Sequence, residues 1–386
     1  MSKKIKSFNF ILIIFIALFL TGCWDNEELD TISIVTGVGI DAADTEGNIK
    51  LSLQVGKINQ EKSTPQSAGG SDDSIILEIE EKSILTGTNE LERQVTRALF
   101  MFHNQVIIFG KEQAKKEIKP YIETFIRQND MRMETLVFIS EGEAKDILDI
   151  KMEQDKISSF GITKMIEGIQ RYDETYSIRV LDLVCMIMDE GTTPVLPILK
   201  IEGSDKSRLL LKGLAILDNE KYIGELNETE TRGYTWIRGK FKNTFIEVDT
   251  EDGLAILNMS NIRYKLKPQI KGEDLIMDLE ILGDVVFSEV QGFHNMTIEE
   301  TTKIILEGAK EKINEEIEAS LSKSKKLKTD FLGFGTEYHK RFPKVWEDVK
   351  EHWENIFPEI SLITNIELNL IDTGKIRNSL DMKEGK

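Results

Sequence analysis

The sequence predicts an α+β fold spread over more than one domain, and three observations carry this prediction. Residues 49–55 alternate apolar and polar side chains, which is the period of a half-buried strand. Residues 297–322 instead repeat apolar side chains at steps of three and four, the period of an amphipathic helix. The chain has 386 residues, which is long enough for two or three domains with their own cores.

The first half predicts a β-hairpin followed by interleaved helices and strands. The β-branched run at 31–40 and the alternating run at 49–55 flank a turn-forming segment, and together they predict the hairpin. The later elements follow from short apolar runs and from helical periodicity. We expect strands at 75–80, 105–110 and 135–140, and helices at 90–101, 112–127, 143–150 and over most of 155–190.

A linker-like stretch at residues 202–207 divides the chain. We therefore predict a signal segment at 1–22, an N-terminal α+β domain at 23–200 and a C-terminal α+β domain at 206–378. A further division of the second domain near 295, into a strand-rich part and a long-helix part, stays open. The predicted strands of this half are 209–217, 221–224, 245–248, 254–258, 261–267, 273–287 and 360–370, and the predicted helices are 225–232, 297–322 and 344–357.

The aromatic side chains near the C-terminus are predicted to lie in a core. Trp346 and Trp353 are seven residues apart, which places them on one face of the predicted helix at 344–357. An exposed binding surface is the alternative for the aromatic residues between 331 and 353. Helical spacing of this kind is more typical of a buried face.

The composition excludes some classes of partner. The formal net charge is −18, so the phosphates of a nucleic acid would be repelled. The same charge argues against adhesion to anionic lipid through surface charge. Cys23 and Cys185 are the only cysteines. Cys185 lies within an apolar run at 180–188, and we expect it to be a small buried side chain.

The N-terminus is typical of a secretory signal. Three lysines precede a run of apolar residues at 10–20. That run is too short to cross a membrane as a helix but suits the central region of a signal peptide. A slightly longer uncleaved anchor is the alternative.

The residues Leu20-Thr21-Gly22-Cys23 resemble the lipobox of bacterial lipoproteins. In that class the cysteine thiol receives diacylglycerol, the bond between Gly22 and Cys23 is cleaved, and the new amine can be acylated. Two or more acyl chains anchor a protein stably. The alternative is a plain signal peptide with an incidental cysteine. Lipidation of Cys23 would leave Cys185 without a partner for an intrachain disulfide.

No motif for catalysis or metal binding is present. No pair of histidines or cysteines has the spacing of a zinc site, and a nucleophile-elbow motif is absent. Gly37-Val38-Gly39 lacks the third glycine of a nucleotide-binding loop. We therefore expect a protein that is not an enzyme and that needs no cofactor and no metal. The histidines are His103, His294, His339 and His352.

Four segments, in order along the chain, resemble one family, the C subunits of spore germinant receptors or GerAC-like lipoproteins. The first is Gly22-Cys23-Trp24-Asp25 with Glu28-Leu29, and the second is 100–110. The third runs from Gly213 through Gly224 to Trp236. The fourth is 330–335 with Phe342-Pro343, Trp346 and Trp353.

The resemblance implies up to three subdomains, each a mainly antiparallel β-sheet with flanking helices. It also implies a non-catalytic receptor subunit that nutrient-triggered spore germination requires. Such subunits carry palmitate or similar acyl chains and lie on the outer face of the cytoplasmic, spore inner, membrane. Their partners are two integral membrane subunits, A-type and B-type, one of which resembles an amino-acid transporter.

The second hypothesis is a solute-binding lipoprotein of an ABC-type transporter. Proteins of that class combine a lipobox with two similar βαβ halves around a cleft. The strand-rich second half of this chain does not favour that arrangement. An enzymatic lipoprotein is a third class, and it would need a catalytic constellation that the sequence does not show.

Overall fold

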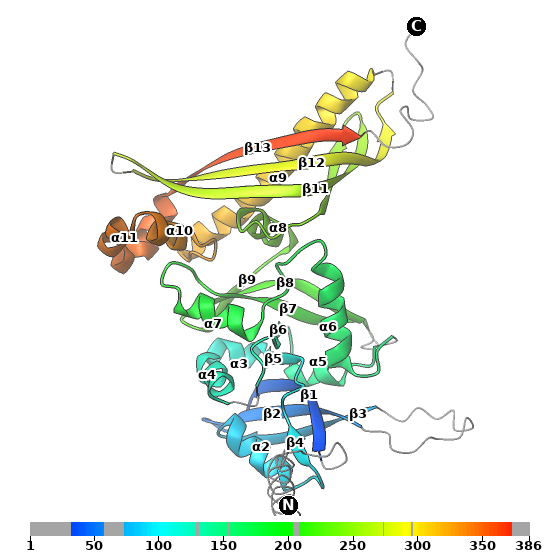
Figure 1. Ribbon diagram of the computed structural model, residues 1–386, viewed down its shortest axis with the longest axis vertical. Coiled ribbons are helices and arrows are strands. Elements are labelled where there is room, and N and C mark those ends of the chain that lie inside the picture. Colours follow the sequence, from blue (N-terminus) through cyan, green and yellow to red (C-terminus); the bar gives the residue numbers. More distant parts are fainter. Residues whose placement is uncertain are drawn as a thin grey trace, which may run out of the picture.

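The computed structural model describes residues 32–57, 73–128, 131–152, 154–203, 208–272, 274–294 and 296–372. These residues form two lobes stacked along the long axis of the molecule (Figure 1). The N-terminal lobe is built on a nine-stranded sheet and the C-terminal lobe on a four-stranded sheet. The α+β prediction is confirmed, and antiparallel pairing predominates in both sheets.

The nine-stranded sheet has parallel strands at its centre and antiparallel strands at both sides. Its order is β3-β2-β1-β5-β6-β7-β8-β9, and β4 lies beside β1. Pairing is parallel from β1 through β5 and β6 to β7. The strands are β1 (Ile32–Ala42), β2 (Ile49–Gly56), β3 (Ser74–Glu81), β4 (Ala98–Phe100), β5 (Val106–Gly110), β6 (Leu136–Ser140), β7 (Val195–Glu202), β8 (Arg208–Asp218) and β9 (Lys221–Leu226).

Helices cover both faces of this sheet and create a separate apolar core on each. One core contains the buried side chains of α2, α3, α4 and α7, and the other contains those of α5 and α6. Burial on both faces explains why β5 and β6 are apolar throughout. The helices are α2 (Ile84–Glu92), α3 (Lys111–Lys116), α4 (Lys119–Arg127), α5 (Ala144–Asp149), α6 (Ser158–Ile169) and α7 (Val180–Met188).

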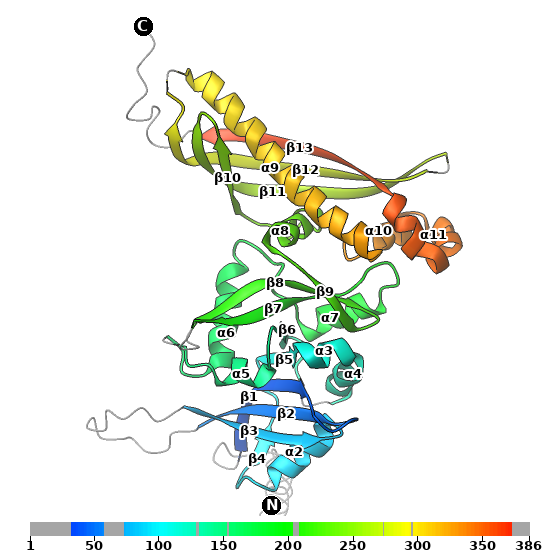
Figure 2. The same cartoon turned by 180° about the vertical axis from the view of Figure 1, so that it is seen from behind.

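The C-terminal lobe packs one long helix against one face of the four-stranded sheet. Three strands form an antiparallel meander, and β13 returns parallel to β12. Helix α9 (Ile298–Leu327) crosses one face of this sheet, and no helix of the described residues lies on the opposite face (Figures 1 and 2). The strands are β10 (Thr244–Thr250), β11 (Gly253–Lys271), β12 (Asp274–Gly292) and β13 (Ser361–Asp372).

Helix α9 follows its predicted pattern closely. Thr297 and Glu300 form a capping box at its start, and Lys328 ends it in a left-handed conformation. The apolar stripe is fully buried at Ile305, Ala309, Ile313 and Ile317. The stripe therefore supplies most of the contact between this helix and the sheet.

The segment between α9 and β13 is a cluster of short helices rather than the single predicted helix at 344–357. It contains α10 (Phe334–Arg341), α11 (Pro343–Val349) and α12 (Trp353–Ile356), with 3₁₀ turns at Lys350–His352 and Phe357–Glu359. Trp346 and Trp353 are buried, and their ring centroids are 5.0 Å apart. The prediction that these aromatic residues belong to a core is confirmed.

In the structure, the chain passes from the first lobe to the second at a later point than the predicted boundary at 200–206. Residues 200–202 of that boundary belong to β7, which pairs with β8. Strands β8 and β9 were assigned to the C-terminal domain at 206–378, but they extend the N-terminal sheet because β8 pairs antiparallel with β7. The chain passes to the second lobe through helix α8 (Glu228–Ile237).

The structure differs from two of the helices predicted in the first half, because contacts with distant residues determine these segments. The prediction of a helix at 90–101 is wrong, because residues 98–100 form β4 against the start of β1. The predicted helix at 112–127 divides into α3 and α4. The backbone N–H of Ile118 leaves the helical pattern and donates to the carbonyl of Glu220 at 3.1 Å.

The prediction that Cys185 is buried is wrong. Helix α7 buries Val180 and Leu183, whereas Cys185 is exposed. An apolar run on a short helix therefore does not bury every member, because only one side of this helix faces the sheet.

Exposure of Cys185 can be tested by thiol labelling. We expect the native full chain to incorporate one maleimide at Cys185 as rapidly as a small-molecule thiol does, because the sulfur is accessible. Peptide mass spectrometry would locate the label, and Cys185→Ser is the control that should not be labelled at this position. Labelling only after denaturation would contradict the exposed position.

Candidate functional site

The predicted lipidation residues, Gly22 and Cys23, lie outside the described residues. The nearest described residue is Ile32, where β1 begins. This start of β1 pairs with β4 at the end of the N-terminal lobe that is farthest from the small sheet (Figures 1 and 2). An anchor at Cys23 would therefore act on this end of the molecule.

The described residues contain no group of three or more histidine, cysteine and acidic side chains placed to hold a metal ion. In the same part of the chain, no helix combines the length and the apolar character that a membrane crossing needs. The four histidines are all described, and none of them contributes to such a metal-binding group.

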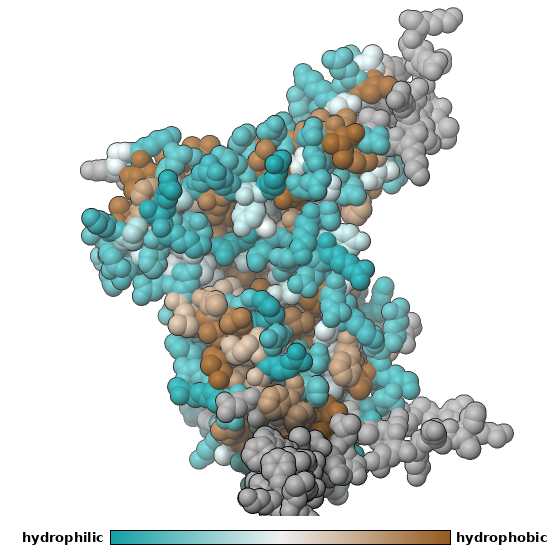
Figure 3. Space-filling model, in the orientation of Figure 1, coloured by the Kyte–Doolittle hydropathy of each residue, from teal (hydrophilic) through white to brown (hydrophobic). Residues whose placement is uncertain are grey.

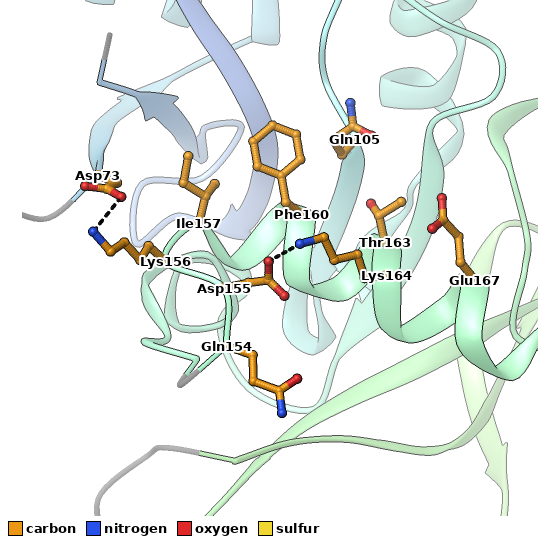
Figure 4. Close-up of a pocket in the computed structure, with 10 residues that line it drawn as sticks. All are labelled: Asp73, Gln105, Gln154, Asp155, Lys156, Ile157, Phe160, Thr163, Lys164 and Glu167. Atoms are coloured by element: carbon orange, nitrogen blue, oxygen red, sulfur yellow. Dashed lines mark hydrogen bonds and ion pairs between the residues drawn. The ribbon is translucent and has the colours of Figure 1, made fainter. Parts of the chain in front are cut away.

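A cavity of about 490 Å³ lies against helix α6. Its lining includes two apolar side chains, Ile157 and Phe160, and several charged ones (Figure 4). Four of the charged side chains form two ion pairs: Lys164 pairs with Asp155, and Lys156 lies 3.1 Å from Asp73. A charged ligand would have to compete with both ion pairs, so this cavity is a poor candidate for recognising one.

The most highly organised polar site is the joint between the lobes, and its centre is Asp330. This carboxylate is buried, and one oxygen accepts the backbone N–H groups of Gly333 at 2.7 Å and Phe334 at 3.1 Å. The other oxygen accepts the N–H of Gly335 at 2.7 Å and the indole N–H of Trp353 at 3.0 Å. Burial raises the pKa of Asp330 to about 6, although the four donors act in the opposite direction.

The turn that Asp330 organises contacts a loop of the first lobe. The N–H of Thr193 donates to the carbonyl of Asp330 at 2.8 Å, and the N–H of Thr336 donates to the carbonyl of Gly191 at 3.0 Å. The hydroxyl of Thr336 also donates to Asp189 at 2.7 Å. A Cβ atom at Gly191 would lie 2.2 Å from the nitrogen of Thr336, so the backbones meet where only glycine fits.

Helix α8 joins the same region through a second buried carboxylate, Glu316 of α9. Its two oxygens accept from the guanidinium of Arg232 and from the indole of Trp236, each at 2.7 Å. A Cβ atom at Gly233 would lie 1.8 Å from the carbonyl oxygen of Glu316. The two helices therefore pack with their backbones in close approach, and the charge of Glu316 is compensated within the protein.

The joint brings together the third and fourth segments of the family resemblance. The rings of Tyr234 and Phe331, which are distant in sequence, have centroids 6.4 Å apart. Arg238, just after α8, donates to the carbonyl of Leu332 at 3.1 Å. These groups bind one another, so the joint is suited to fixing the lobes relative to each other. Sequence reasoning placed no site here, because the contacts between the two segments join residues far apart in the chain.

Comparison with protein families gives two matches that together cover most of the chain. Residues 25–201 match the model described as the spore germination protein N-terminal domain. Residues 212–374 match the model described as spore germination B3/GerAC like, C-terminal.

Individual relatives agree with these matches. Spore germination protein KC of Bacillus subtilis (strain 168) is 24% identical, and the alignment covers 96% of each chain. Spore germination protein B3 of the same strain is 20% identical over 95% of this chain and 98% of its own. The crystal structure of the GerBC protein superposes with a TM-score of 0.57 at 18% identity, covering 90% of this chain and all of that one, and so has the same fold.

The role of Asp330 can be tested with Asp330→Asn. Asparagine has a single acceptor oxygen, so two of the four N–H donors would face an amide N–H₂ group and lose their partners. We expect the free energy of unfolding to fall by about 2–4 kcal/mol, measured by denaturant titration. Asp218→Asn, at the exposed end of β8, is the matched control and should change it by less than about 0.5 kcal/mol.

The pH dependence supplies a second readout of the same carboxyl group. Its pKa is raised from 3.8 to about 6 in the folded protein, so the folded state binds the proton more tightly than the unfolded chain does. The stabilisation from that proton is complete below pH 3.8 and is lost as the pH rises through about 6. The stability difference between wild type and Asp330→Asn should therefore shrink by roughly 1 kcal/mol from pH 5 to pH 7.5. A difference that grows with pH would show that the four donors outweigh burial.

Proposed function

Because the chain belongs to the family of GerAC-like spore germination proteins, we propose that it is the lipid-anchored, non-catalytic subunit of a nutrient germinant receptor. The observation that carries the proposal is the match of both family models, in order, over nearly the whole chain. The proposed place is the outer face of the cytoplasmic membrane, which is the inner membrane of the spore. The proposed partners are two integral membrane subunits.

The anchor is proposed to be Cys23, with diacylglycerol on its sulfur and an acyl chain on its amine after cleavage behind Gly22. Three observations support it. The residues before the cysteine resemble a lipobox, the net charge of −18 disfavours adhesion to anionic lipid through the protein surface, and β1 starts only nine positions after the cysteine. A chain of that length spans at most about 30 Å, so the β4 end of the first lobe would stay close to the membrane.

The proposed role is to hold partners in a defined arrangement and not to bind a solute between two lobes. The lobes are unlike, since one contains a nine-stranded mixed sheet and the other a four-stranded sheet with one long helix. At the joint, buried side chains and backbone groups from both lobes bind one another directly. These features favour the receptor subunit over the solute-binding lipoprotein of a transporter.

The anchor can be tested by metabolic labelling with palmitate. We expect Cys23→Ala to abolish labelling and to release the protein from the membrane fraction, because no other group would carry the lipid. Cys185→Ala is the matched control and should keep both properties, since Cys185 lies on the exposed side of α7. A Cys23→Ala protein that still incorporates palmitate would refute Cys23 as the site.

The receptor role can be tested with spores that lack the protein. We expect germination to slow with one set of nutrients and to stay normal with others, while heat resistance is unchanged. The wild-type gene should restore the rate, and the Cys23→Ala gene should restore it only in part, because the subunit would be lost from the membrane. Normal germination with every nutrient tested would contradict the receptor role even if palmitate labelling succeeds.

A further inference from the structure

One edge of the four-stranded sheet is formed by β10 and by the part of β11 beyond it, and this part of β11 carries the usual protection against further pairing. Strand β10 pairs with residues 253–259 of β11, so within the described residues the rest of β11 is an edge. This part of β11 contains Lys265, Lys267, Pro268 and Lys271. Lysine and proline are the residues with which natural proteins keep an edge from accepting another strand.

The opposite edge, β13, lacks this protection. The strand has 12 residues, Ser361–Asp372, and none of them is lysine, arginine or proline. In the part of the chain that the structure describes, its strand partner is β12 alone. The N–H and C=O groups along its other side, from Ser361 to Leu370, are therefore available to an additional strand.

The open face of the sheet beside this edge is partly apolar. Ile363 is 48% exposed and lies on the same side of β13 as Glu367 by the two-residue period. Ile371 is 55% exposed and is the extra residue of a bulge near the end of the strand. Between them lies Glu367, also exposed, opposite Leu282 of β12. Figure 3 looks onto this face and shows hydrophobic side chains among hydrophilic ones over the small sheet.

A second copy of this chain is disfavoured in the two registers that align the apolar side chains or equal residues. An antiparallel register that sets Ile363 against Ile371 of the second copy also sets Glu367 directly against its own counterpart. A parallel register that aligns equal residues has the same consequence. Two carboxylates opposite one another on a sheet are destabilising, so the charge of Glu367 disfavours self-pairing in these registers.

We propose that the free edge of β13 binds an extended segment of another protein, which adds a fifth strand to the small sheet. That segment would carry apolar side chains opposite Ile363 and Ile371 and a lysine or arginine opposite Glu367. Main-chain hydrogen bonds would supply affinity, and these three side chains would fix the alignment of the added strand with β13. This interaction surface does not depend on the lipid anchor.

The proposal can be tested with two fluorescent peptides and the full chain purified in detergent. One peptide has the sequence of β13, SLITNIELNLID, and the other has lysine in place of its glutamate, SLITNIKLNLID. We expect the lysine peptide to bind about fivefold more tightly, because it places a cation opposite Glu367. Glu367→Lys in the protein should reverse this preference.

A matched pair of variants locates the binding site. The double substitution Ile363→Lys and Ile371→Lys adds protecting lysines to the edge, and we expect it to weaken binding of the lysine peptide at least about tenfold. Ile298→Lys is the control and should leave binding unchanged, because Ile298 is similarly exposed, at 47%, but lies on α9. These side chains are exposed, so each variant is expected to fold.

Three results would overturn the proposal. The first is equal binding of the two peptides, or no binding at the limit of their solubility. The second is binding that the double lysine substitution leaves intact. The third is sedimentation of the wild-type chain as a dimer that the double substitution dissociates, since a second copy would then occupy the edge.

Discussion

The arrangement of the two lobes depends on the burial of one carboxylate, Asp330. Its side chain closes the turn at Gly333–Gly335 by accepting three backbone N–H groups, and its main-chain carbonyl accepts the N–H of Thr193 from the other lobe. One residue therefore shapes the turn and also joins it to the first lobe. A buried carboxylate with four donors is costly to displace, because any movement would leave donors and charge without partners.

Glu316 follows the same principle on the other side of the joint. It is buried, and it accepts from Arg232 and Trp236 of α8 at 2.7 Å each. In the cavity beside α6, two lysines are likewise paired with two aspartates. In each of these three places carboxylates find their partners within the protein. We therefore expect this chain to bind partners at its surface and not in an internal charged pocket.

Periodicity was sufficient where an element is determined locally, as in the hairpin of β1 and β2 and in helix α9 with its capping box at Thr297. It failed where a distant segment decides the structure. Residues 98–100 become β4 because β1 offers a partner, and Ile118 leaves its helix because Glu220 accepts its N–H. Cys185 is exposed because the sheet lies on only one side of α7, which a run of apolar residues does not reveal.

The same distinction applies to the sites. The Cys23 motif is local and can be recognised in a few residues, whereas the joint requires Tyr234 and Phe331 to meet across the fold. An open strand edge is harder still to recognise, because its donors and acceptors are main-chain groups that every residue carries. Its sequence signal is that β13 contains no lysine, arginine or proline. This signal can be interpreted only once the structure shows that β13 is an edge strand and that the lysines and proline of β11 lie on the other edge. A binding surface of this kind is therefore invisible to motif searches and becomes evident only when the two edges of one sheet are compared.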